Sequence, residues 1–150
     1  VDANGNPIGR SGSPIDPLIV GMTVPTGGEI VISNPRNGVM TPIPGSIVDA
    51  IKTVFPASEW STAMKIIAAE SGGIGVVGTN SDGSRDVGPF QINTYHNNLN
   101  VFSKALGYTV TEANLRDNPL VAAQVAYELY KSSGNNWGAW TTYGAFIKGR

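Results

Sequence analysis

The aromatic residues of this chain are confined to its later part. All four Phe, three Trp and five Tyr residues lie at Phe55 or beyond, whereas seven of the ten prolines lie within the first 45 residues. Because aromatic side chains contribute much of the buried surface of a core, we expect one independent domain built from residues 46–150. Residues 1–45 are predicted to form a Pro/Gly-rich extended arm or linker that precedes it.

The arm nevertheless contains two patterns typical of strands. The segments LIVGMTV (18–24) and EIVIS (29–33) flank Pro-Thr-Gly-Gly, a sequence typical of turns. Together they predict a β-hairpin that packs on the domain or pairs with a neighbouring chain by strand addition. The alternative is a linker without regular structure that packing holds in place.

After residue 45 the apolar residues recur at the spacing of helices. The predicted helices cover residues 46–55, 58–71, about 99–106, 118–134 and a last short segment with Trp137, Trp140 and Tyr143. Ser46 and Asp49 have the spacing of a capping box, and Asn118 followed by proline is a strong helix start. Residues 74–88 contain an Asn-Ser-Asp-Gly turn and predict a small sheet or hairpin. We therefore expect an α+β protein, mainly helical, with one small β element.

The composition excludes several classes of function. A net charge of −1 gives no electrostatic footprint for nucleic acid, and no apolar stretch approaches the ~20 residues of a membrane span. The absence of cysteine excludes thiolate metal sites and disulfides, and one histidine argues against a histidine-rich metal centre. No metal or organic cofactor is expected. The chain begins at Val1 without a signal peptide, so we expect it to be processed or cut from a longer protein.

Glu70 has an unusual position for a charged residue. It shares a helix face with Ile66 and Ile67 and lies in the last turn, where unpaired carbonyl groups make the potential negative. Both conditions disfavour a charged carboxylate and predict a raised pKa for Glu70. A carboxyl that stays protonated near neutral pH suits the general acid of glycoside cleavage. The alternative is a solvent-facing glutamate beside the Gly-Gly turn.

Asp86 lies in a polar turn 16 residues after Glu70. A polar setting keeps a carboxylate ionised, and two carboxyls with diverging pKa values form the acid/base signature of a glycosidase. Alternatively, Asn80, Asp82 and Asp86 are ordinary turn formers. The segment NSDG (80–83) lacks the third alternating ligand and the downstream glutamate of an EF-hand calcium loop. We expect Asp86 to be the partner of Glu70 and Asp82 to shape the turn.

The wider motif resembles a known enzyme family. Glu70-Ser71 followed by DGSRDVGPFQIN (82–93) is similar to the E-S … D-G-S-x-D-x-G-x-x-Q-I-N signature of lysozyme-like peptidoglycan glycosidases. It resembles both c-type lysozymes and the lytic transglycosylases of secretion and conjugation systems. The resemblance spans roughly residues 46–146 and omits the arm. It implies a lysozyme-like fold, with the small β element at the substrate cleft.

The resemblance also implies a role for each matching residue. Glu70 would be the general acid and Asp86 the nucleophile or electrostatic stabiliser. Gln91 and Asn93 would bind the sugar backbone and N-acetyl groups, and Trp137 would complete the apolar pocket of Glu70. Tyr95 would either stack on a sugar ring or pack in the core. Since animal lysozymes carry disulfides and this chain has no cysteine, it resembles a bacterial or phage branch.

The expected function is cleavage of the β-1,4 bond between N-acetylmuramic acid and N-acetylglucosamine in peptidoglycan. One alternative is a lytic transglycosylase that leaves 1,6-anhydromuramyl products. Another, of a different class, is a non-catalytic wall-binding component of a phage tail or secretion machine. The expected partners are peptidoglycan glycan strands, without nucleic acid or membrane insertion, at the cell wall outside the cytoplasm. The arm leads us to expect delivery within a larger assembly, a phage virion first and a secretion apparatus second.

Overall fold

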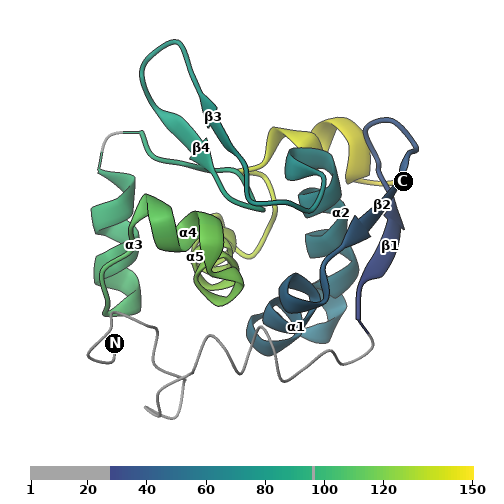
Figure 1. Cartoon of the computed structure of the whole chain (residues 1–150), viewed down its shortest axis with the longest axis horizontal. Helices are drawn as coiled ribbons and strands as arrows, with labels where there is room; N and C mark the ends of the chain where they lie inside the picture. Colours follow the sequence, from purple (N-terminus) through teal and green to yellow (C-terminus); the bar gives the residue numbers. More distant parts are fainter. Residues whose placement is uncertain (1–27, 96) are drawn as a thin grey trace.

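Helix α5 (Pro119–Ser132) is the central element of the computed structural model, which describes residues 28–95 and 97–150 (Figure 1). The Asn118 side chain caps this helix by accepting hydrogen bonds from the backbone N–H groups of Leu120 and Val121. Pro119 occupies its first turn, as the sequence predicts. Three other helices pack against α5, namely α1 (Gly45–Val54), α3 (Asn98–Leu106) and α4 (Glu112–Asp117).

The described residues form an α+β structure that is mainly helical, as predicted. The helices expected at 46–55, 58–71, 99–106 and 118–134 are confirmed, whereas α4 was not predicted. The expected capping box at Ser46 is wrong, because α1 begins at Gly45 and its N-cap is Pro44, which has no side-chain cap. None of the helices in the described part of the chain is long and apolar enough to cross a membrane.

Helix α2 (Trp60–Ser71) follows a short 3-10 helix, η2 (Ala57–Glu59). It ends at Gly72, whose backbone φ of 70° is left-handed and whose N–H bonds to the carbonyl groups of Ala68 and Ile67. Because glycine adopts a left-handed backbone conformation more easily than almost any other residue, Gly72 determines where α2 ends. Glu70 consequently lies in the last turn of α2.

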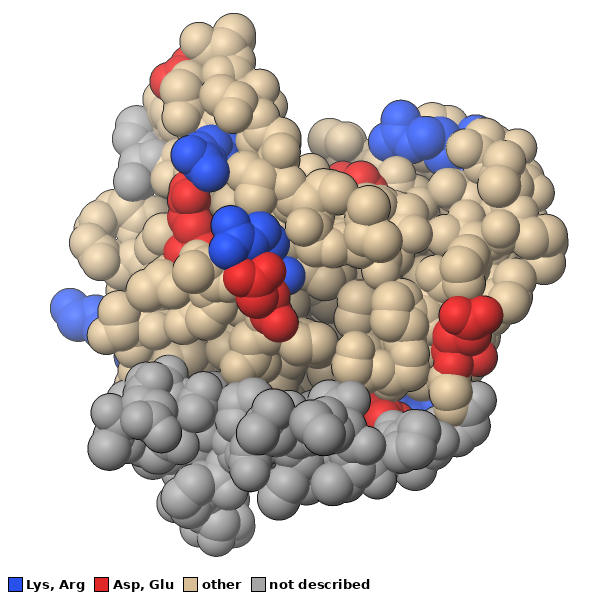
Figure 2. Space-filling model, viewed as in Figure 1, with Lys and Arg blue, Asp and Glu red and all other residues tan. Residues whose placement is uncertain are grey.

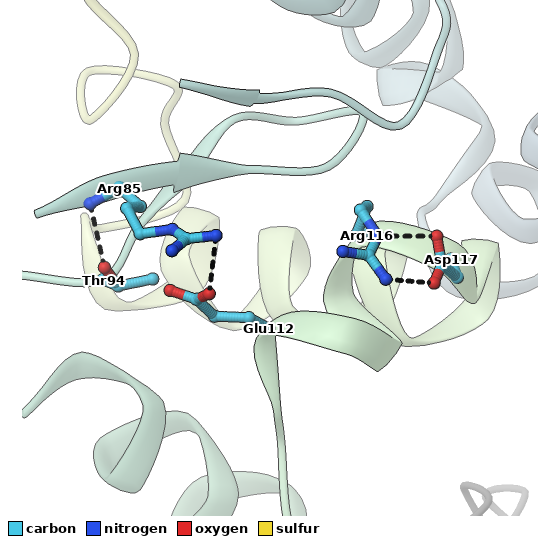
Figure 3. A network of polar contacts seen from close by, with 5 residues as sticks. All are labelled: Arg85, Thr94, Glu112, Arg116 and Asp117. Carbon is cyan, nitrogen blue, oxygen red and sulfur yellow. Dashed lines mark hydrogen bonds and ion pairs between the residues drawn. The ribbon is translucent and has the colours of Figure 1, made fainter. Parts of the chain in front are cut away.

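The sheet β3–β4–β5 projects from the helices at one side of the molecule (Figure 1). Its antiparallel strands are β3 (Val77–Thr79), β4 (Arg85–Val87) and β5 (Ile92–Asn93). The backbone N–H of Arg85 donates to Oγ1 of Thr94, just after β5, at 3.0 Å, and its guanidinium pairs with Glu112 of α4 at 3.4 Å (Figure 3). The small sheet predicted between helices is therefore confirmed, with β5 beyond the predicted residues 74–88.

A second sheet, the β1–β2 hairpin, lies within the predicted arm. Strand β1 (Ile30–Ser33) confirms the strand expected at 29–33, and its described partner is β2 (Met40–Ile43), which was not predicted. The other expected strand, 18–24, lies outside the described residues. The hairpin packs on α2, where Ile43 is fully buried and Asn34 donates to the carbonyl of Ala68 at 2.9 Å. The division of the chain at residue 45 stays a prediction.

The C-terminal segment closes the core with aromatic side chains. Trp137 and Trp140 are buried in turns that precede a π-helix, η3 (Tyr143–Ile147). The short helix predicted to include both tryptophans is wrong in extent, because backbone bonds from Trp140 to Trp137 and from Tyr143 to Trp140 close single turns there. The indole N–H of Trp140 donates to the carbonyl of Phe90 at 2.9 Å. This bond ties the segment to the loop before β5.

Any side chain at position 88 is predicted to destabilise the protein. Its φ is +81°, and an added Cβ would lie 2.4 Å from the carbonyl oxygen of Leu115. Gly83 has a similar φ of +85° with open space around it, so Gly83→Ala is the matched control. In urea denaturation, Gly88→Ala is expected to lower the free energy of unfolding by about 2–5 kcal/mol, and Gly83→Ala by about 1–2 kcal/mol. Equal losses would contradict the close approach of β4 to α4.

Candidate active site

The carboxyl of Glu70 is half-buried at the C-terminal end of α2. Burial raises the pKa of Glu70 above its ordinary value of 4.5, because a charged carboxylate loses hydration there. A hydrogen bond from Thr142 and the positive charge of Arg36 lower this pKa, and the negative charge of Asp86 raises it; burial is the largest effect. The raised pKa predicted from the sequence is thus confirmed in its direction.

Thr142 holds the Glu70 carboxyl from the C-terminal segment. Its hydroxyl donates a hydrogen bond of 2.8 Å to Oε1 of Glu70, across 72 positions of sequence. Thr142 is 3% exposed, so this bond is largely shielded from competing water. Because Oε1 accepts the bond, we expect the acidic proton on Oε2. No sequence pattern pointed to Thr142, since only the folded chain brings it to α2.

Arg36 is a second residue that the sequence did not indicate. It lies in the turn between β1 and β2, and its Nε donates to the carbonyl of Ala69 at 3.2 Å. Its guanidinium lies over the ring of Phe146, 5.2 Å from the centroid. The turn of the predicted arm therefore places a positive charge beside Glu70. The resemblance to lysozyme-like glycosidases omitted the arm, so no motif marked this arginine.

Asp86 is held by two amide side chains on the β3–β5 sheet. Nδ2 of Asn80 donates to Oδ2 of Asp86 at 3.2 Å, and Nδ2 of Asn93 donates to Oδ1 at 2.9 Å. Strand register explains the second contact, since Asp86 and Asn93 are direct cross-strand partners. The charge of Asp86 acts on the pKa of Glu70, so the two carboxyls lie within electrostatic range of each other. The structure thus brings together Glu70, Asp86 and Asn93.

Two further polar residues of this region bind the backbone. Asp82 accepts hydrogen bonds from the backbone N–H and hydroxyl of Ser84 at 2.8 and 2.6 Å, so it shapes the turn as expected. Nε2 of Gln91 donates to the carbonyl groups of Val76 and Gly88 at 3.1 and 2.9 Å. Gln91 thereby braces the sheet. Its contact with sugar stays a prediction.

Tyr95 and Trp137 differ sharply in exposure. Tyr95 is 44% exposed, and its backbone N–H donates to Oδ1 of Asn93 at 2.7 Å. Tyr95 is therefore partly open to solvent, and its backbone contacts Asn93, which donates to Asp86. Trp137 is 3% exposed and stacks on Phe55 with ring centroids 5.3 Å apart, in a cluster that includes Tyr130. The described contacts of Trp137 are with the aromatic core, and its role in substrate binding stays a prediction.

The surface is hollowed between the β3–β4 projection and the part that carries the β1–β2 hairpin and the C-terminal segment (Figure 2). Acidic atoms lie within the hollow, and basic atoms gather on its rim at the hairpin side. An extended polymer fits such an open channel, and a proton-donating carboxyl with a second carboxylate suits glycosidic chemistry. Among the described residues, no cluster of three His, Cys, Asp or Glu side chains could hold a metal ion.

Comparison with known proteins identifies the family. The family model described as "Lysozyme like domain" matches residues 49–142. Searches of curated proteins and of solved structures give no match. The matched segment contains Glu70, Asp86 and Thr142 but not Arg36. At family level the protein is a glycosidase or transglycosylase that acts on peptidoglycan, outside the cytoplasm. The chain therefore belongs to the family of lysozyme-like domains.

Proposed function

We propose that this protein cleaves the β-1,4 bond between N-acetylmuramic acid and N-acetylglucosamine, with Glu70 as general acid and base. The observation that carries the proposal is the Glu70 carboxyl, whose pKa burial raises, within electrostatic range of Asp86. A carboxyl with a raised pKa keeps its proton nearer to neutral pH, where it can donate that proton. The upward shift of the Glu70 pKa, caused mainly by burial, is therefore what a general acid near neutral pH requires.

In the proposed mechanism, Oε2 of Glu70 donates its proton to the glycosidic oxygen while the bond from that oxygen to C1 of the muramyl sugar breaks. Positive charge develops on the sugar ring, and the Asp86 carboxylate stabilises it covalently or electrostatically. Water then attacks C1, and Glu70 takes up the proton of that water. The hydrogen bond from Thr142 to Oε1 keeps the carboxyl in one orientation throughout.

The substrate-binding residues form part of the same proposal. The exposed ring of Tyr95 offers a stacking surface for a sugar. Asn93 orients Asp86, and Gln91 supports the sheet that carries Asp86. We infer that the amide oxygen of Gln91 meets an N-acetyl group. Trp137 supports the site through the aromatic core. For Asn93, Gln91 and Trp137 these contacts support a positioning role, and contact with sugar is the added proposal.

A lytic transglycosylase would use the same acid. In that reaction the 6-hydroxyl of the muramyl sugar, rather than water, attacks C1 and gives Glu70 its proton. The product then carries a 1,6-anhydromuramyl end and is lighter by one water than the hydrolysis product. Mass analysis of fragments released from purified peptidoglycan distinguishes the two reactions. Anhydro ends throughout would exclude hydrolysis.

A non-catalytic wall-binding component is the alternative of a different class. Such a protein gains nothing from a buried carboxyl in the negative potential of a helix C-terminus, which costs stability once the group ionises. Glu70 and Asp86 are nevertheless both present and electrostatically linked. Membership of a virion or secretion assembly, through residues 1–45, remains our expectation for how the enzyme reaches the wall.

Glu70→Gln is predicted to abolish peptidoglycan cleavage without unfolding the protein. Glutamine keeps the size of the side chain but cannot donate the proton, and a general acid contributes about 10²–10⁴-fold to the rate. The release of soluble fragments from purified peptidoglycan measures the loss, and circular dichroism monitors the fold. The exposed Glu29, changed to Gln, is the matched control. Full activity of Glu70→Gln would refute the assignment.

The stability of the protein is predicted to depend on the protonation of Glu70. Because the folded-state pKa is raised, the stabilisation by the bound proton is complete below pH 4.5 and is lost as pH rises through the folded-state pKa. Glu70→Gln should therefore unfold at a higher temperature than wild type at neutral pH. This difference should shrink in acid, in thermal unfolding measured across the pH range. A difference that does not vary with pH would contradict the raised pKa.

A further inference from the structure

Arg36 lies on a turn that is tightly fastened to the end of α2. The Asn34 carbonyl accepts a backbone bond from Gly38 at 2.7 Å, and the Asn34 side chain accepts the N–H of Arg36 at 2.9 Å. The same buried side chain donates to the carbonyl of Ala68 at 2.9 Å. One asparagine therefore sets both the shape of the turn and its place against the helix that carries Glu70.

The Arg36 side chain is fixed from two directions. Its Nε donates to the carbonyl of Ala69, the residue before Glu70, and the Phe146 ring lies under its guanidinium. A cation over an aromatic face is attracted to the ring, which limits its movement. An arginine held in this way loses little further conformational entropy when it binds an anion.

The guanidinium acts on Glu70 without pairing with it. Its positive charge lowers the Glu70 pKa, yet Arg36 forms no ion pair with any residue in the described part of the chain. Among the described residues, its two terminal nitrogens also donate no hydrogen bond. The side chain therefore carries two charged donors that can bind an anion, and its charge reaches the acid.

We propose that Arg36 binds a carboxylate of the lactyl-peptide arm of muramic acid, and so selects peptidoglycan over neutral amino-sugar polymers. The inference rests on the proposed function. Of the two sugars in the strand, only the muramyl sugar carries such an arm, and the planar guanidinium matches a carboxylate in a bidentate pair. Asp86 disfavours an anion on the opposite side of the hollow, so the arm is directed toward the hairpin.

The test compares native peptidoglycan with peptidoglycan whose carboxyls have been converted to amides. Initial rates are measured for wild type, Arg36→Met and Arg36→Lys, with Arg116→Met as the control because Arg116 is exposed and pairs with Asp117. The loss of a charge-assisted hydrogen bond predicts that Arg36→Met is about 3- to 30-fold slower on the native substrate. The loss should nearly disappear on the amidated substrate, and Arg36→Lys should recover part of it.

The ratio of the rate on native peptidoglycan to the rate on amidated peptidoglycan separates carboxylate binding by Arg36 from a structural role. If Arg36 only supports α2 or adjusts the Glu70 pKa, Arg36→Met will slow both substrates equally, and the inference is wrong. An unchanged rate on native peptidoglycan overturns it as well. If wild type cleaves neither substrate, the proposed function fails, and this inference fails with it. If wild type cleaves peptidoglycan, and Arg36→Met has the same ratio of native to amidated rates as wild type, the inference is wrong but the proposed function stands.

Discussion

The half-buried carboxyl of Glu70 is the constraint on which the rest of the site depends. The last turn of α2 is an unfavourable place for a negative charge, and burial makes it more so. The Thr142 hydroxyl and the Arg36 charge partly offset this cost, but burial dominates the pKa. The protein therefore gives up stability at neutral pH to keep this carboxyl half-buried, a trade that fits the proton donor that we propose.

Three separate parts of the fold converge on this carboxyl. The β1–β2 hairpin supplies Arg36, the C-terminal segment supplies Thr142, and the β3–β5 sheet supplies Asp86. Each part is anchored by a specific contact of its own, such as the bond from Trp140 to Phe90 or the pair between Arg85 and Glu112. The site is thus preorganised by the packing of the whole domain rather than by α2 alone.

Local signals in the sequence were sufficient for much of the fold. Gly72 ends α2 and Asn118 begins α5 because each depends on backbone chemistry within a few residues. The short helix α4 was missed, and the capping box at Ser46 was misplaced by the early start at Gly45. Strand β2 was missed as well, since its Pro42 weakens the strand pattern.

The residues of the candidate site also fall into two groups, those that local sequence predicts and those that only the folded chain reveals. Glu70 and Asp86 could be proposed from a motif and from helix periodicity, both of which are local. Arg36 and Thr142 could not, because their relation to Glu70 exists only after a hairpin and a distant terminal segment pack on α2. The exposure of Tyr95 and the burial of Trp137 likewise follow from tertiary packing, which residue type alone does not reveal.

The most direct test of this account is the titration of the Glu70 carboxyl carbon by NMR, with the resonance assigned from its absence in Glu70→Gln. Burial in the last turn of α2 predicts a midpoint clearly above the ordinary glutamate value of 4.5. A midpoint at or below 4.5 would mean that Glu70 is solvated and ionised like any surface glutamate. Its assignment as the proton donor would then be wrong.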